Sequence, residues 1–222
     1  MELDRRTESG WEIAMSDVLA VLAGQEYEWH KHDSLRLDER YRTRHLPLLT
    51  DRPRGPLGPD PGPGEFWPPA RSLVIPLPDP RPEPFLSALA DSSLAGLVWW
   101  CGLELRADRV HATLVHGSDE PRALAAPIDL IVRGPWIGQM NTGRIYLPVE
   151  PADERAALAL AAERPLLAGY LQLTADVMGD AYAELRDLVA TFQPVRTHVR
   201  VHQLHVLETM DDLALRSRIL NP

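Results

Sequence analysis

The sequence predicts an α+β fold. Apolar, strand-like runs and amphipathic helical segments follow one another in a mixed order, without the regular alternation of a doubly wound parallel sheet. The chain has 222 residues, enough to bury a sizeable core in one large domain or in two small lobes. A stretch rich in proline and glycine, 51–70, divides the chain before the first of these strands.

The composition argues against several classes of function. A formal net charge of −9 disfavours broad binding to duplex DNA, although a local cationic pocket can still hold a small nucleotide or an RNA end. We predict a cytoplasmic protein without membrane spans, because the sequence has no run of 18 apolar residues and no apolar signal-peptide core. Cys101 is the only cysteine, which excludes a disulfide framework and a cysteine-based zinc site.

The two segments that precede the main domain differ in kind. Residues 1–50 carry apolar side chains at helical spacing, which predicts an N-terminal helical extension. Residues 51–70 contain too many prolines for a helix or a central strand, so they are predicted to be a linker or a mobile surface loop, with a functional lid as the alternative.

Residues 71–222 are predicted to form the α+β domain. Its expected strands are 72–77, 97–105, 110–115, 129–133, 143–149, 170–174 and 195–207. Its expected helices are 83–90, 152–162 and 181–192, while 213–220 is either a strand or a helix.

His111 and Thr113 are the first candidate site residues. Side chains alternate along a strand, so the two lie next to each other on one face of 110–115. An imidazole can move a proton and a hydroxyl can donate a hydrogen bond to a phosphoryl oxygen, so the pair suits a phosphate group. A histidine that is hydrogen-bonded inside the core is the alternative, since a chain of this composition contains roughly one such motif by chance.

A later segment, 169–179, echoes the plan of the first. Gln172 corresponds to His111, Thr174 corresponds to Thr113, and both segments continue through apolar residues to a glycine. Each is followed by a pair of strand-like runs. The echo suggests two lobes of similar plan, each of which presents a polar-x-Thr strand to a shared cleft.

This layout resembles the 2H phosphoesterase superfamily, which includes LigT-like, 2′-5′ RNA ligase and cyclic phosphodiesterase proteins. The resemblance covers about residues 71–210 and rests on Val110-His111-Ala112-Thr113-Leu114 and on the strands at 129–134, 144–150 and 199–207. It implies a two-lobed α+β fold with antiparallel sheets around a central cleft. It also implies hydrolysis of a cyclic phosphate or of a 2′,5′- or 3′,5′-phosphodiester in a nucleotide or RNA end.

The resemblance further implies a mechanism. In the family, one histidine acts as general base and a second as general acid, while threonines hydrogen-bond the phosphoryl oxygens. His111, Thr113 and Thr174 would take these roles here. Gln172 stands where the family has its second histidine, and a glutamine amide neither gains nor loses a proton at neutral pH. Because loss of one acid–base partner costs about 10²–10⁴ in rate, the chain is either slow or inactive, or another residue supplies the proton.

The late strand offers candidates for that proton donor. Arg196, His198, Arg200 and His202 share one strand face by parity. Such a stripe would attract phosphate, and His198 or His202 would supply the proton. A solvent-facing polar face of the strand is the alternative.

We predict no metal and no cofactor. His205 lies on the opposite face of the late strand from His198 and His202, so the three cannot converge on one ion. His30 and His32 are two apart, and residues at that spacing on a helix do not face each other.

Three more residues are predicted to contact the substrate, together with Arg200. Arg133 would reach a phosphate, or else pair with one of the many carboxylates. Trp136 and Tyr146 would stack on a base at the mouth of the cleft. Loop anchoring or core packing is the alternative for both aromatic residues.

The sequence leaves three functions open. The first is a 2H-like phosphoesterase that uses histidine-based acid–base catalysis. The second is a binding module that keeps the cleft and holds a nucleotide or phosphorylated metabolite without turnover, for which Gln172 is the reason. The third is a protein-interaction domain whose 1–50 extension docks a partner. The sequence does not predict the oligomeric state.

Overall fold

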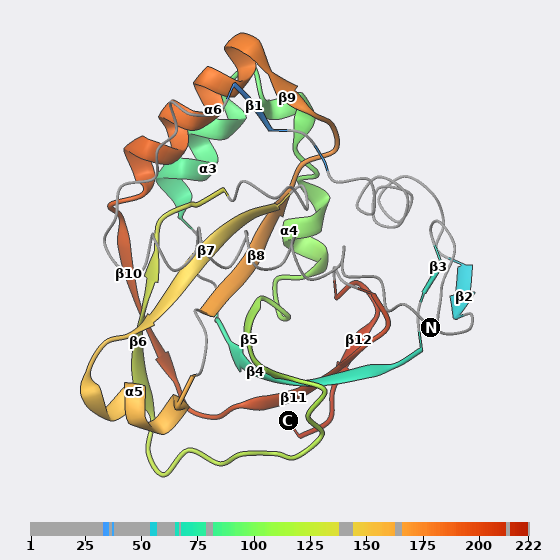
Figure 1. Cartoon of the computed structure of the whole chain (residues 1–222), viewed down its shortest axis with the longest axis vertical. Helices are drawn as coiled ribbons and strands as arrows, with labels where there is room; N and C mark the ends of the chain where they lie inside the picture. Colours follow the sequence, from blue (N-terminus) through green and yellow to red (C-terminus); the bar gives the residue numbers. More distant parts are fainter. Residues whose placement is uncertain are drawn as a thin grey trace, which may run out of the picture.

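The fold is known from a computed structural model that describes residues 33–35, 37, 54–56, 65–66, 68–78, 82–137, 144–162, 166–211 and 214–221 (Figure 1). It is an α+β fold, as the sequence predicts, and its largest sheet is antiparallel throughout. None of the helices in the described part of the chain is long and apolar enough to cross a membrane.

Eight of the described strands form one sheet. Their spatial order is β10 (Arg196–Val201), β6 (Ile128–Arg133), β7 (Arg144–Pro151), β8 (Leu166–Gln172), β5 (His111–His116), β4 (Ala70–Pro76), β11 (His205–Thr209) and β12 (Ser217–Ile219). The sequential neighbours β4 and β5 pair side by side, as do β6 and β7, whereas β5 and β8 meet in the middle of the sheet.

Alternation along the strands gives the sheet two faces. In β6, Ile128, Leu130 and Val132 are buried in the main core, while Asp129 and Arg133 on the other side are half exposed. We call the side with Ile128, which includes Ala112 and Ala168 of the central strands, the core face. The opposite side, which carries Asp129 and Arg133, is the outer face.

The two longest helices lie against each other at one end of the molecule (Figure 1). They are α3 (Glu83–Ala90), at the predicted bounds, and α6 (Gly179–Phe192). The Phe85 and Phe192 rings meet edge to face with centroids 5.8 Å apart, and Leu89 and Leu185 add fully buried surface to the core. The shorter α5 (Glu154–Leu160) begins at Asp153, whose carboxylate accepts a hydrogen bond from the Ala156 N–H at 2.7 Å.

The predicted strand over 97–105 is wrong. This segment forms a short 3₁₀ helix (Ala95–Leu97) and the helix α4 (Cys101–Leu105). The indole of Trp100 donates a hydrogen bond to the Ala95 carbonyl at 2.9 Å, which folds the chain back on itself. Trp99 lies against Gly102, where any Cβ would collide with the indole ring. Apolar composition indicated a strand, but these local contacts of the two tryptophans favour a compact turn.

The predicted single strand over 195–207 is also wrong. It breaks after Val201, and its two parts pair in different places: β10 with β6, and β11 with β4. Residues 202–204 join β10, at one edge of the sheet, to β11, next to the other edge. Leu204 is buried in the main core at this bend. The link therefore requires the sheet to curve around its core, as in packed sheets whose corners are made by bent strands (Figure 1).

Part of the predicted N-terminal extension belongs to the main fold. Ser34–Leu35 (β1) is a strand and not a helix, and it pairs with Val177–Met178 (β9). Leu35 and Leu37 are buried in the main core, and the Leu37 N–H donates to the Asp176 carboxylate at 2.8 Å. Residues 1–32, which include His30 and His32, as well as 36 and 38–50, lie outside the described residues.

Two short strands lie within the predicted linker. Arg54–Pro56 (β2) and Glu65–Phe66 (β3) pair in parallel and form a two-stranded sheet of their own. At the other end of the chain, the 213–220 alternative is settled in favour of a strand, because Ser217–Ile219 pairs with β11.

Candidate functional site

His111 and Thr113 lie on the outer face of a central strand, as their spacing predicts. Ala112 and Leu114 between and after them are buried in the core, and both candidate side chains are half-buried. Each has a defined cross-strand neighbour on β4: Pro76 for His111 and Val74 for Thr113. The central position of β5 therefore holds the pair firmly in the middle of the sheet.

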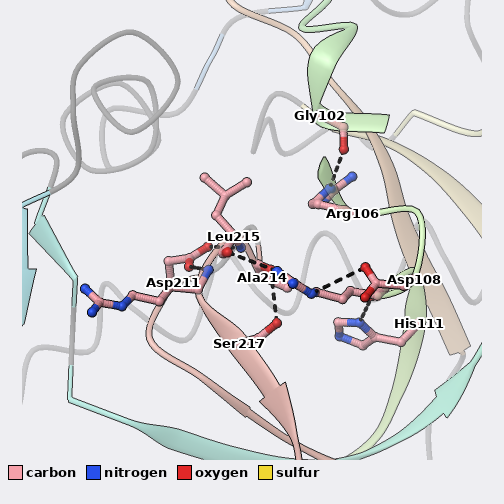
Figure 2. A network of polar contacts seen from close by, with 10 residues as sticks. Gly102, Arg106, Asp108, His111, Asp211, Ala214, Leu215 and Ser217 are labelled. Carbon is pink, nitrogen blue, oxygen red and sulfur yellow. Dashed lines mark hydrogen bonds and ion pairs between the residues drawn. The ribbon is translucent and has the colours of Figure 1, made fainter. Parts of the chain in front are cut away.

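The ring of His111 is held in one tautomer. Its Nδ1 atom lies 2.7 Å from the carbonyl oxygen of Arg109. Because a carbonyl oxygen can only accept, Nδ1 carries a hydrogen. Nε2 is then the ring nitrogen that accepts or releases a proton. The adjoining Arg109 side chain donates to the Leu215 carbonyl at 3.1 Å, which ties the start of β5 to the C-terminal turn (Figure 2).

A cation lies across the centre of the outer face. Ala112 pairs with Ala168, so the next residues on the two antiparallel strands, His111 and Gly169, are neighbours on the outer face. Arg144 on β7 lies over that glycine: a Cβ at Gly169 would be 3.2 Å from Arg144 Cδ and 3.7 Å from its Nε and Nη1 atoms. The absence of a side chain at Gly169 thus leaves room for the Arg144 side chain over this position, beside His111 on the neighbouring strand.

An aromatic residue lies on the far side of the same glycine. Tyr146 on β7 is the cross-strand partner of Gly169 and is half-buried. Trp136 pairs with Tyr146 through two backbone hydrogen bonds, and their rings are 6.0 Å apart. Trp136 is only 1% exposed, so it packs beneath Tyr146 and is not placed to stack on a base as predicted. Tyr146 remains accessible on the outer face.

The second predicted motif does not lie next to His111. Gln172 ends β8 opposite Arg144, three residues beyond Gly169 and roughly 7–10 Å further along the strand. Its side chain is buried. Thr174 lies beyond the strand, and its hydroxyl donates to the Leu97 carbonyl at 3.2 Å.

The local two-fold axis of the central pair identifies the corresponding residues. It passes through the Ala112–Ala168 pair and relates His111 to Leu167 and Thr113 to Gly169. The segment that matches His111-Ala112-Thr113 in place is thus Leu167-Ala168-Gly169. The echo in the sequence is displaced from this position, and the displacement depends on register, which composition does not reveal.

Hydrogen bonds along the edge of β8 hold Gln172 and Thr174 away from His111. Beyond its contact with β5, the edge of β8 is bound by residues on either side of α4. The buried guanidinium of Arg106 donates to the Tyr170 carbonyl, and the Trp99 N–H donates to the Gln172 carbonyl at 2.8 Å. The Thr174 N–H donates to the Leu97 carbonyl at 2.9 Å. These contacts commit the end of β8 to the fold.

The predicted residues on the late strand lie on a different part of the sheet from His111. His198 and Arg200 are on the outer face of β10, and three strands, β6, β7 and β8, separate β10 from β5 in the sheet. Arg200 lies 3.6 Å from Asp129. Arg133 on β6 forms an ion pair of 2.8 Å with Glu150. These arginines pair with carboxylates, the alternative that the sequence left open for Arg133.

His202 lies in a pocket at the bend between β10 and β11. The pocket has a volume of about 460 Å³. Its lining residues are Pro76, Leu77, Pro78, Ala107, Asp108, Val110, Arg200, Val201, His202, Gln203 and His205. Burial lowers the pKa of His205, and its Nε2 lies 2.9 Å from the amide nitrogen of Gln203.

Three residues of this region were not predicted from the sequence: Arg144 on the outer face, and Asp108 and His205 in the pocket. Arg144 shares a strand face with Tyr146, two residues later, so parity could have identified it once Tyr146 was chosen. Asp108 and His205 reach the pocket through a turn and a bend, and no periodic signal marks either. Within the described residues, no group of three or more His, Cys, Asp or Glu side chains is placed to hold a metal ion.

No protein-family model matches the chain, and neither a curated protein nor a solved structure matches it. The resemblance to the 2H phosphoesterases therefore stays a prediction from the sequence.

Proposed function

We propose that this chain binds the phosphoryl group of a nucleotide or phosphorylated metabolite on the outer face of its central strands. One observation carries the proposal: His111 and Arg144 flank Gly169 on the same face, with Thr113 two residues along from His111. A guanidinium gives charge-assisted hydrogen bonds to phosphate, and a hydroxyl and an imidazole add further donors. Arg144 on β7 lies over Gly169 of β8, and His111 and Thr113 are on β5, the strand next to β8, so the three side chains can serve one small anion.

The arrangement favours binding over turnover. The positions related to His111 and Thr113 by the local two-fold hold Leu167 and Gly169, neither of which can move a proton. In-line displacement at phosphorus needs a base on one side and an acid on the other. His111 and Thr113 form one half of such a site. In the other half, Leu167 supplies only an apolar side chain, and Gly169 leaves a space that Arg144 occupies.

A two-lobed, LigT-like arrangement is part of the proposal. Its support is the symmetry of strand order: β8, β7, β6 and β10 follow one another on one side of the central pair, and β5, β4, β11 and β12 follow on the other. The site would lie where the two halves meet, and His111 would be the retained motif histidine.

Slow phosphoesterase activity is the second candidate, and the tautomer of His111 favours it. With Nδ1–H bound to the Arg109 carbonyl, Nε2 can take a proton from water as the water oxygen attacks phosphorus. The bond to the leaving oxygen breaks, and that oxygen takes its proton from solvent. A cyclic phosphate would yield a phosphomonoester at a rate lower by about 10²–10⁴ than with both groups in place.

Thermal unfolding with a ligand panel tests the binding. Ligand at 100 times its Kd adds about 2.7 kcal/mol, which raises Tm by roughly 5–10 °C for a domain of this size. We expect such a shift with 2′,3′-cyclic nucleotides or nucleoside monophosphates in the wild type and in His198→Gln. We expect none in His111→Gln or Thr113→Val. Equal shifts in His111→Gln and His198→Gln, or no shift with any phosphorylated compound, would contradict the proposal.

Phosphorus NMR of the same mixtures separates the two candidates. A phosphomonoester that accumulates with wild type and not with His111→Gln would establish turnover. Binding without product over a day would leave the chain as a binding module.

A further inference from the structure

We infer that the pocket at the β10–β11 bend receives the heterocyclic base of a nucleotide whose phosphoryl group lies at His111, Thr113 and Arg144. The inference rests on the proposed function and deepens it: it names the ligand class and the residues that select it. None of Asp108, Gln203 and His205, which would read the base, belongs to the phosphoryl site.

The pocket begins where the phosphoryl site ends. Pro76, which lines it, is the cross-strand partner of His111, and Val110, another lining residue, directly precedes His111. Asp108 also lines the pocket, and the next residue, Arg109, supplies the carbonyl that holds the His111 ring. A single ligand can therefore reach both places.

The lining suits a flat, mostly apolar ring. Leu77, Val110 and Val201 are buried side chains of the main core that reach the pocket, and Pro76 and Pro78 extend this apolar surface. A volume of about 460 Å³ falls in the range of small-molecule sites, which combine an apolar lining with a few convergent polar groups. An aromatic heterocycle has the same combination, with apolar faces and a polar edge.

The polar groups offer both donors and acceptors to that edge. An amide nitrogen only donates, so the Gln203 amide donates to His205 Nε2, and the His205 ring is neutral with its hydrogen on Nδ1. The Gln203 carbonyl oxygen and the Asp108 carboxylate are acceptors. Two acceptors and one ring N–H match the exocyclic amine and ring nitrogens of a purine or cytosine better than a sugar or an alkyl chain.

The rim carries the remaining charge. Arg200 and His202 stand at the mouth, and the carboxylate of Asp108 is on the part of the lining that precedes β5. Arg200 is already paired with Asp129 at 3.6 Å. Asp108 is paired with Arg109, whose Nε lies 3.4 Å from its carboxylate. The pocket is therefore close to neutral, which suits an uncharged base.

Competition between a nucleotide and its baseless counterpart tests the inference. Isothermal titration of the full chain would compare AMP, CMP and UMP with ribose 5-phosphate. We expect AMP or CMP to bind the wild type at least tenfold more tightly than ribose 5-phosphate. Ala107→Phe places a ring in the pocket from an exposed position. It should remove that tenfold advantage and change ribose 5-phosphate affinity less than twofold.

Two further variants complete the design. Ala125→Phe adds the same ring at an exposed position that does not line the pocket, and should bind like the wild type. Asp108→Asn removes one acceptor and should lower the AMP or CMP affinity without changing that of ribose 5-phosphate. Equal wild-type affinity for nucleotides and ribose 5-phosphate, or equal effects of Ala107→Phe on both, would overturn the pocket assignment alone. Failure of all these ligands to bind would overturn the proposed function and this inference with it.

Discussion

Gly169 is the residue on which the proposed anion site depends most directly. A methyl group there would lie 3.2 Å from Arg144 Cδ, closer than most real Cβ contacts, so Gly169→Ala should push the arginine away from the sheet. Because a charge-assisted hydrogen bond is worth about 1.5–3 kcal/mol, phosphoryl affinity should fall by roughly 10–100-fold. Titration calorimetry with the best ligand from the panel would measure the loss.

Gly96→Ala is the matched control for that substitution. A Cβ at Gly96 would meet nothing within 4 Å, so the change should leave ligand affinity as it is. If Gly169→Ala binds as tightly as Gly96→Ala, the role assigned to Arg144 is wrong.

Glu208 makes part of the stability depend on pH. Hydrogen bonds from Arg218 at 2.7 Å and Arg71 at 3.0 Å hold the pKa of this carboxyl below its ordinary value of 4.5. A lowered folded-state pKa means that the stabilisation is present above the unfolded-state value and is lost as the pH falls through the folded-state value. We expect Glu208→Gln to destabilise the protein at pH 7 and to matter progressively less below about pH 4.5.

Urea unfolding of both proteins at pH 7 and pH 3 would measure this difference. A gap in unfolding free energy that stays the same at the two pH values would show that the carboxylate charge is unimportant.

For single residues, the sequence predicted which strand face a side chain occupies, but it did not predict which side chains of other strands lie beside it. Strand parity correctly placed His111 and Thr113 on one face, because alternation is a property of a single strand. The contact of Arg144 with Gly169 depends on the register between β7 and β8, and that register includes a bulge between Ile145 and Tyr146. The sequence does not show this bulge. In the sequence Gln172 is therefore the counterpart of His111, whereas Gly169 is the residue of β8 that lies beside His111.

Among the elements, helix α5 allows the contribution of a single N-cap to stability to be measured. The Asp153 carboxylate caps its N-terminus through the Ala156 N–H, and loss of such a cap costs about 1 kcal/mol. Asp153→Ala should lower the unfolding free energy by that amount. Arg155→Ala, on the exposed side of the same helix, should have little effect. Equal effects of the two changes would show that general helix propensity, and not the cap, is being measured.

The elements that the sequence predicted well share one property: their signals are local. Proline at the start of α3 and the apolar face of α6 mark helices without reference to the rest of the chain. The structure of 97–105 depends on contacts of Trp99 and Trp100. The break after Val201 depends on the different strands with which the two parts pair, β6 for β10 and β4 for β11. Both were missed because apolar composition alone does not distinguish a turn from a strand.

For the molecule as a whole, residues 33–37 matter more than their place in a predicted extension suggested. Leu35 is 3% exposed in the main core, and replacing a buried leucine by alanine costs about 2–5 kcal/mol. Leu35→Ala should therefore destabilise the whole domain by that amount. Leu158→Ala is the control, because Leu158 is 74% exposed. Denaturant unfolding in which the two variants behave alike would mean that the N-terminal segment is dispensable.

The same packing bears on the hypothesis of a docking arm. A chain that lacks residues 1–65 would lose Leu35, Leu37 and the hydrogen bond to Asp176, so we expect it to be less stable than the full chain. The sequence could not reveal this, since a pair of leucines beside a charged segment looks the same whether it is buried or not. The α+β class, by contrast, follows from the order of elements, and the structure agrees with it.

The three-residue link between β10 and β11 also governs how the chain can fold. Contacts such as Arg71 with Glu208 join positions 137 residues apart, and closing a loop of that length costs about 4 kcal/mol in chain entropy. Once the strands from β4 to β6 have assembled and β10 has paired with β6, however, the link already holds β11 near β4, so the second closure costs little more. The two pairings should therefore form and break together. Folding would wait for a single late event, and a substitution that weakens β10 would be felt at the opposite edge of the sheet.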